Sequence, residues 1–95
     1  MRVSVIIPTH NEVQAIARVL ADIPADLVTE VIVVDSNSTD GTPGIAAGMG
    51  ARVLQEPRRG YGRACLTGLS AANSPDIVVF LDGDTAIGLL NCRFS

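Results

Sequence analysis

Several residue types are missing or scarce in this 95-residue chain. All seven cationic residues are arginines. A Walker-type phosphate loop needs a lysine before its serine or threonine, so that class of site is excluded. Aromatic residues make up 3% of the chain, tryptophan is absent and the net charge is −3. Because nucleic-acid-binding proteins present basic surfaces, often with aromatic stacking platforms, we expect no nucleic-acid partner.

The chain also has few cysteines and no long apolar segment. Cys65 and Cys92 stand far apart, with no histidine or cysteine at ligand spacing, which argues against a zinc site or a disulfide scaffold. No uninterrupted apolar run reaches the roughly 18 residues of a membrane span, and the first residues do not have the pattern of a secretory signal. We therefore expect a cytoplasmic protein whose 47% hydrophobic residues form one globular domain.

Short apolar runs alternate with polar segments that contain glycine. The runs are residues 3–7, 30–34, 52–54 and 77–81. Most are rich in β-branched residues and nearly continuous in apolar character, which is typical of strands buried on both faces of a parallel sheet. They predict four strands.

The segments between these runs predict three helices. In the first, apolar residues follow helical spacing from Val13 to Leu20, and Asn11 is expected as the N-cap. The second has Thr42 as its expected N-cap and Pro43 as its first residue, and the third spans residues 62–72. Strands that alternate with helices are normally parallel, so we expect an open, doubly wound, mostly parallel α/β sheet that ends after the fourth strand.

Carboxylates follow three of the predicted strands. In a doubly wound sheet, ligands bind outside the carboxyl ends of the strands. Glu12 follows the first strand, Asp35 ends the second, and Asp82 and Asp84 follow the fourth. Each also has a simpler interpretation as a cap or turn residue. Two carboxylates around Gly83 can hold a divalent cation whose other ligands are phosphate oxygens, so the pattern favours a metal diphosphate.

Other groups expected at this edge suit an anion. The start of the first helix offers free N–H groups for a phosphate or a sugar hydroxyl. Arg58, Arg59 and Arg63 cluster in or before the third helix, where they either contact phosphate or form a solvated loop. No glycine-rich turn follows the first strand, which excludes a dinucleotide fingerprint. His10, the sole histidine, has no visible partner and is open as an acid, a base or an incidental residue.

Four segments together resemble a known family. They are VSVIIPTHNE, EVIVVDSNSTDGT, RRGYGRACLTGLSAA and DIVVFLDGD. In order and spacing they look like the N-terminal half of family 2 glycosyltransferases, in the branch of the dolichyl-phosphate mannose synthases. The resemblance implies a Rossmann-like nucleotide-diphospho-sugar transferase fold of the A type. It implies a nucleotide-sugar-binding half-domain at residues 1–84, followed by a tail, 85–95, that does not look like the family.

The resemblance also implies roles for individual residues. Those that would bind the nucleotide are Pro8, Thr9, Glu12, Asp35, Arg59, Arg63 and Asp82. Among them, Asp35 would contact the base, and Arg59 or Arg63 would lie near the phosphates. Asp82 and Asp84 would form the metal motif, with Asp84 as the direct ligand of Mg²⁺ or Mn²⁺. Such enzymes transfer a sugar from a nucleotide donor, here a UDP- or GDP-sugar, to an acceptor such as a lipid phosphate or a sugar, usually with inversion.

The resemblance stops before the acceptor side of the family's site. No aspartate or glutamate follows Asp84, so no acceptor-side catalytic base can be assigned. Two function classes stay open: a glycosyltransferase that is inactive as this short chain, and a nucleotide- and metal-binding module without catalysis. A lipid acceptor would bring the protein to a membrane. An uncovered fourth strand predicts a homo-oligomer, unless residues 85–94 fold back and cover the sheet.

Overall fold

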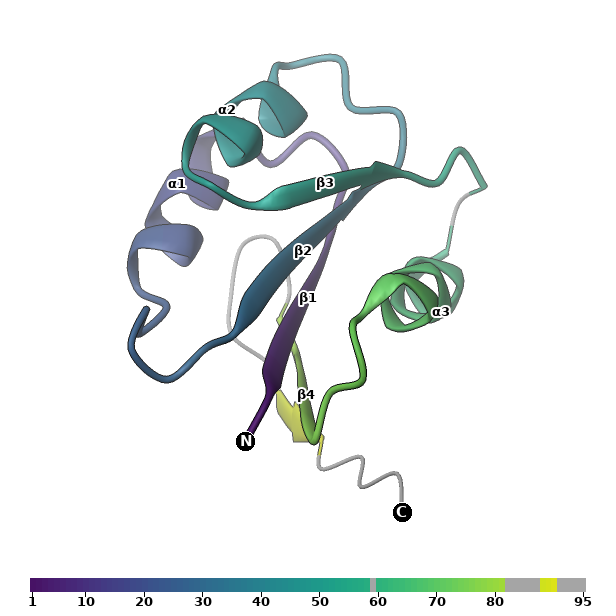
Figure 1. Ribbon diagram of the computed structural model, residues 1–95. Helices are drawn as coiled ribbons and strands as arrows, with labels where there is room; N and C mark the ends of the chain where they lie inside the picture. The colour runs from purple at the N-terminus through teal and green to yellow at the C-terminus, as the bar shows by residue number, and fades with distance from the viewer. Residues whose placement is uncertain (59, 82–87, 91–95) are drawn as a thin grey trace.

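The computed structural model describes residues 1–58, 60–81 and 88–90 (Figure 1). In chain order its elements are β1 (Val3–Thr9), α1 (Val13–Ala21), β2 (Glu30–Asp35), α2 (Thr42–Gly48), β3 (Arg52–Gln55), α3 (Tyr61–Ala71), β4 (Ile77–Phe80) and β5 (Gly88–Leu90). The elements from β1 to β4 follow the alternation predicted from the sequence. None of the helices among the described residues is long and apolar enough to cross a membrane.

The strands form one sheet in the order β3-β2-β1-β4-β5. The β1 strand lies at the centre and pairs in parallel with β2 and β4, and β3 pairs in parallel with β2. The predicted Rossmann-like, mostly parallel sheet is confirmed. The strand order reverses at β1, since β2 and β3 follow on one side and β4 on the other. The carboxyl edge beside β1 is therefore the place where such a sheet binds ligands.

The short strand β5 agrees with the alternative in which residues 85–94 fold back onto the sheet, although its bounds were not predicted from the sequence. It pairs antiparallel with β4, and Gly88 lies opposite Phe80. The sheet therefore does not end at its fourth strand, and the edge of β4 that we expected to be uncovered is paired. Three residues are too few to show a strand pattern in the sequence. Self-association, expected from that uncovered edge, stays a prediction.

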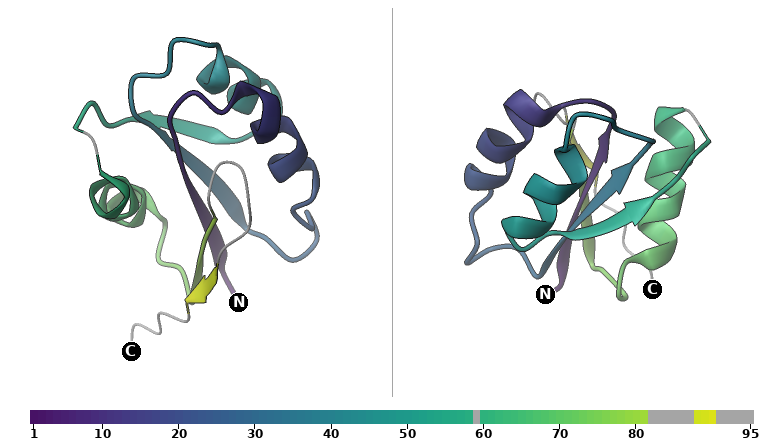
Figure 2. Two further views of the ribbon diagram at one scale, coloured as in Figure 1. Left: turned by 180° about the vertical axis from the view of Figure 1, so that it is seen from behind. Right: turned by 90° about the horizontal axis from the view of Figure 1, so that it is seen from above.

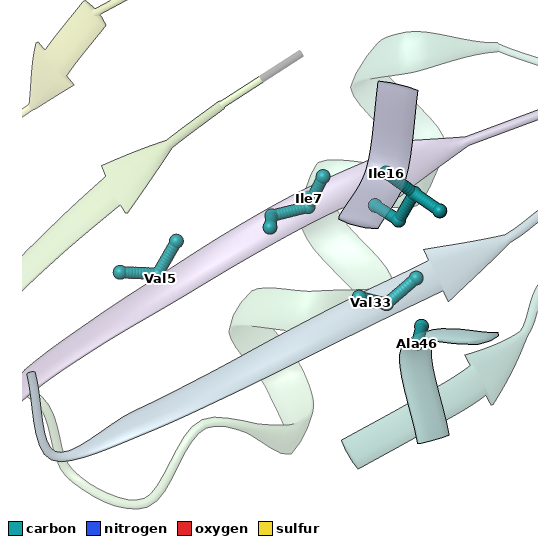
Figure 3. Close-up of a cluster of buried hydrophobic side chains, with 5 residues drawn as sticks. All are labelled: Val5, Ile7, Ile16, Val33 and Ala46. Atoms are coloured by element: carbon teal, nitrogen blue, oxygen red, sulfur yellow. The ribbon is translucent and has the colours of Figure 1, made fainter. Parts of the chain in front are cut away.

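Helices cover both faces of the sheet. Figure 2 shows α1 and α2 on one side and α3 on the other. Alternate residues of β1 point to opposite faces. On the first face, Val5 and Ile7 pack with residues of β2, α1 and α2, as Figure 3 shows. On the second, Ile6 packs with residues of β2, β4 and α3. Because the strands are buried on both faces, their sequences lack a polar alternation.

The starts of α1 and α2 differ from the prediction by one residue each. Glu12, not Asn11, is the N-cap of α1, and it makes no side-chain capping bond. Asn11 adopts the left-handed region, with φ 55°, and its side-chain oxygen accepts a hydrogen bond from the Thr39 N–H. The α2 helix begins at Thr42, with Gly41 as its N-cap. The cause is non-local, because the loops after β1 and β2 bind each other.

Candidate functional site

A cavity of about 350 Å³ lies at the carboxyl edge of the sheet, next to β1. Ligand pockets in proteins range from about 300 to 1,000 Å³, so its size suits a small molecule. The residues that line it are Pro8, Thr9, His10, Glu12, Ser36, Gly60, Tyr61 and Ala64. One wall comes from the ends of β1 and β2, and the other comes from the start of α3.

The structure brings some of the predicted site residues together. Pro8, Thr9 and Glu12 line the cavity. Asp35 does not line it, although it lies at the same edge, and Arg63 is an exposed residue in the first turn of α3. Arg59, Asp82 and Asp84 lie outside the described residues. Within the parts of the chain that are described, no three histidine, cysteine or acidic side chains lie close enough together to hold a metal ion.

Asp35 is fully buried at the end of β2. Its Oδ1 accepts hydrogen bonds from the hydroxyls of Thr9 (2.7 Å) and Ser38 (2.6 Å), and its Oδ2 accepts one from the Ser38 N–H (3.0 Å). The Gln55 amide lies 3.4 Å from Oδ2. The carboxylate thus joins the end of β1 to the loop after β2. Its predicted contact with a base stays a prediction.

Asp40 fastens the loop after β2 to the starts of α1 and α2. Its Oδ2 accepts a hydrogen bond from the Val13 N–H, and its Oδ1 accepts bonds from the N–H and hydroxyl of Thr42. The Glu12 N–H donates to the Thr42 hydroxyl, and the Asn11 N–H donates to Ser38. These N–H groups at the start of α1 were expected to be free for an anion. That expectation is wrong, because side chains from another loop bind them.

His10 has a partner that the sequence could not reveal. Its Nδ1 lies 2.6 Å from the backbone oxygen of Ser36. A carbonyl oxygen only accepts, so Nδ1 carries the proton and donates this hydrogen bond. The bond joins the ends of β1 and β2 and fixes the ring in the cavity wall. His10 is therefore a built part of the site.

Glu56 binds the segment between β3 and α3. It is 4% exposed and accepts hydrogen bonds from three nitrogens of Arg58: the backbone N–H (3.2 Å), Nε (3.1 Å) and Nη2 (3.0 Å). The Thr67 hydroxyl donates to the same carboxylate at 2.8 Å. Hydrogen bonds from Arg58, and then from Thr67, lower the pKa of Glu56 to about 2. Of the three clustered arginines, Arg58 is therefore committed to Glu56 rather than free for a phosphate.

The lowered pKa of Glu56 predicts acid sensitivity. Its ordinary value is 4.5, and a carboxylate with a depressed pKa contributes stability above that value and loses it as the pH falls toward about 2. The pKa values of Glu30 and Asp40 are lowered as well. We expect the free energy of unfolding, measured by urea denaturation, to fall over this pH range. The fall should be shallower in Glu56→Gln, and identical slopes in the two proteins would contradict the assignment.

Several residues of the cavity were absent from the predicted site. Ser36 directly follows a predicted strand-end carboxylate, and Tyr61 is the sole tyrosine, between two glycines. Glu56, which lies at the same edge without lining the cavity, directly follows β3 as Asp35 ends β2, and it was not among the predicted site residues. Their position in the sequence could have indicated them, because any polar residue just after a strand of a parallel sheet lies at the same edge.

The fold and this edge site define a Rossmann-like protein of the nucleotide-diphospho-sugar transferase A type. The family model described as Glycosyl transferase family 2 matches residues 4–88. The chain therefore belongs to glycosyl transferase family 2, as its motifs predicted.

Relatives of known sequence are similar over most of this chain. An uncharacterized glycosyltransferase of Mycobacterium tuberculosis (strain H37Rv) is 48% identical over 82 residues, which are 86% of this chain and 36% of the relative. A dolichyl-phosphate hexose transferase of Haloferax volcanii is 46% identical over 83 residues, 85% of this chain and 36% of the relative. The chain thus spans about a third of the length of these relatives.

Solved structures show the same fold. Glucosyl-3-phosphoglycerate synthase of M. tuberculosis, crystallised with Mn²⁺, UDP and glucosyl-3-phosphoglycerate, has a TM-score of 0.77 and 39% identity, over 86% of this chain and 33% of that one. Mannosyl-3-phosphoglycerate synthase of Rubrobacter xylanophilus has a TM-score of 0.82 and 31% identity, over 93% of this chain and 32% of that one.

Proposed function

We propose that this chain binds the nucleotide-diphospho-sugar donor of a glycosyltransferase. The observation that carries the proposal is the cavity at the carboxyl edge, lined by Pro8, Thr9 and Glu12 at the point where the strand order reverses. Family membership supports it, and so does the similarity to a synthase crystallised with UDP. Asp35 would contact the base after giving up one of its internal hydrogen bonds. Arg63, with Arg59, would approach the phosphates.

The proposal includes a divalent cation that binds together with the donor. Asp82 and Asp84 would hold Mg²⁺ or Mn²⁺, and diphosphate oxygens and water would complete its ligands. When bound, the cation neutralises charge on the leaving diphosphate. The similar synthase crystallised with Mn²⁺ supports this choice of metal. Leu81, the residue after β4, donates its N–H to the backbone oxygen of Ile6 in β1 at 3.0 Å, and Asp82 is the next residue in the sequence.

Nucleotide binding that depends on metal is the first test. We expect isothermal calorimetry to show UDP or GDP binding to the 95-residue chain at least about tenfold tighter with Mn²⁺ than without it, because the cation offsets the charge of the diphosphate. Asp84→Ala should remove the Mn²⁺ effect. Asp26→Ala, at an exposed residue outside the site, should keep it. Equal affinities with and without Mn²⁺ for both nucleotides would contradict the proposal.

The acceptor side is proposed only by class. A dolichyl-phosphate hexose transferase among the relatives supports a lipid phosphate, which would bring the protein to a membrane surface, and a sugar is the other candidate.

Since the chain spans about a third of the length of its relatives, we expect the 95-residue polypeptide alone to bind donor without transferring sugar. Incubation with radiolabelled UDP-glucose or GDP-mannose and a polyprenyl phosphate should give no labelled lipid. Labelled product from the pure chain would overturn this expectation and exclude the alternative of a binding module without catalysis.

A further inference from the structure

Glu56 connects the two walls of the cavity. Its backbone N–H donates to the backbone oxygen of Asp35 at 2.9 Å, which ties it to the wall formed by the ends of β1 and β2. Its carboxylate accepts the hydroxyl of Thr67, which lies in α3, and α3 forms the opposite wall. A single buried residue therefore spans from β2 to α3 across the edge of the sheet.

Glu56 holds the segment that leads from β3 to α3, together with a 3.5 Å hydrogen bond from the Asn37 amide to the Pro57 backbone oxygen. Between β3 and α3 the chain passes Gly60, whose φ of 133° is accessible to glycine far more readily than to other residues. The backbone and side-chain nitrogens of Arg58 bind the Glu56 carboxylate two residues earlier, so the loop carries its own internal hydrogen bonds. The next residues, Gly60 and Tyr61, line the cavity. The carboxylate of Glu56 is thus one of the groups that position Gly60 and Tyr61 relative to the β1 wall, beside the packing of α3 on the sheet.

Glu56 itself does not line the cavity, and its charge is already matched. Its carboxylate forms an ion pair with Arg58 at 3.0 Å, and a neutral pair near a diphosphate adds little repulsion. The fourth hydrogen bond comes from Thr67 on another element, so the carboxylate reaches beyond its own loop. These contacts suit a residue that holds other groups in place rather than one that touches a ligand.

We propose that Glu56 is a positioning residue for nucleotide binding, because it holds the Gly60–Tyr61 wall of the cavity at the spacing that a nucleoside diphosphate needs. This inference rests on the proposed function. Preorganised walls bind more tightly because less ordering is left to occur on binding. The pair of Glu56 and Arg58 stays ionised throughout the neutral range, since the pKa of Glu56 is about 2.

The chain contains a built-in probe of this wall. Tyr61 is the only tyrosine and the chain has no tryptophan, so tyrosine fluorescence reports on this position alone. In Glu56→Gln the charge-assisted bonds to Arg58 are lost. We expect acrylamide to quench Tyr61 more strongly in this variant, and UDP with Mn²⁺ to bind about tenfold more weakly, the size of one such bond. Thr67→Val removes only the link to α3 and should shift both readouts in the same direction, by less.

Glu30→Gln is the matched control. Glu30 also accepts a side-chain hydrogen bond, from Ser4, and a backbone one, from Asn73, but it lies at the start of β2 and so at the opposite edge of the sheet. The Glu30→Gln substitution should lower the free energy of unfolding in urea, and it should leave the quenching of Tyr61 and the affinity for UDP unchanged. A purely structural role for Glu56 would give the same result as this control, and that outcome overturns the inference.

The outcomes separate this inference from the proposed function. If the wild-type chain binds UDP and Glu56→Gln binds it equally well with unchanged quenching, the inference is wrong and the proposed function stands. If the wild type binds neither UDP nor GDP, the proposed function fails, and the nucleotide part of the inference fails with it. If Glu56→Gln does not fold, Thr67→Val decides, because loss of one hydroxyl at a half-buried helix position leaves the core clusters intact.

Discussion

Replacing Gly68 by alanine is expected to lower the free energy of unfolding by about 1–2 kcal/mol. Gly68 is buried where α3 crosses β1 and β2, and a Cβ there would lie 2.5 Å from Ile6 Cγ2 and 3.1 Å from Val34 Cγ2. Overpacking a core costs about 1–3 kcal/mol, whereas alanine gains up to about 1 kcal/mol in helix propensity. The steric cost is larger because both neighbours are fully buried and have little room to move.

Gly62→Ala is the control for this experiment. Gly62 lies in the same helix, and a Cβ there would meet nothing within 4 Å. Because this variant has no steric cost, it keeps only the gain in helix propensity of alanine over glycine. Its free energy of unfolding should equal that of the wild type or exceed it by up to about 1 kcal/mol. The stability of both variants is measured by urea denaturation and by the melting temperature. Gly68→Ala should melt about 5–10 °C lower than the wild type. Equal stability of the two variants would show that α3 does not pack as closely as the structure has it.

Asp35→Ala is expected to have the largest effect on stability, a loss of about 3 kcal/mol. The fully buried carboxylate accepts bonds from Thr9 and from both the hydroxyl and N–H of Ser38. Alanine leaves the buried Thr9 hydroxyl without this acceptor, at a cost of about 1–3 kcal/mol, and it also removes the acceptor of the two half-buried Ser38 donors. The loop after β2 should loosen, which native-state hydrogen exchange of the Ser38 amide will detect.

Asp35→Asn should lower the free energy of unfolding by less, about 1 kcal/mol. Its oxygen can accept the Ser38 N–H, and its NH₂ group can donate to the two hydroxyls once they rotate. Asp22→Ala, at an exposed residue after α1, should change stability by less than about 0.5 kcal/mol. If Asp35→Ala were no more destabilising than Asp22→Ala, the loop connection would be wrong. Because Asp35→Asn should stay folded, its affinity for UDP tests the predicted base contact separately.

Much of the fold was predictable because its signals are local. Apolar, β-branched runs such as residues 30–34 predict buried parallel strands, and helical spacing from Val13 to Leu20 predicts α1. Parallel order then places Pro8, Thr9 and Glu12 at one edge, where the cavity lies. Each step needs only short-range sequence patterns and the geometry of an alternating sheet.

Contacts between distant parts of the chain could not be predicted in this way. The start of α1 is bound by Asp40 from another loop, so Asn11 does not cap it. Arg58 looks like a phosphate ligand in sequence, but the buried carboxylate of Glu56 binds it. In both cases a side chain had several partners compatible with its chemistry, and only the folded backbone decided which one lay within reach.

The sequence by itself thus determined the alternation of elements, the two buried faces and the edge of the sheet at which the cavity lies, since these follow from periodicity and chain connectivity. The tertiary structure decided the rest: the pairing of β5 with β4, the bond that fixes His10, and the connection of both cavity walls through Glu56. Hydrogen-bond energies depend on distances of about 3 Å, and such distances between residues far apart in sequence exist only after the chain has folded.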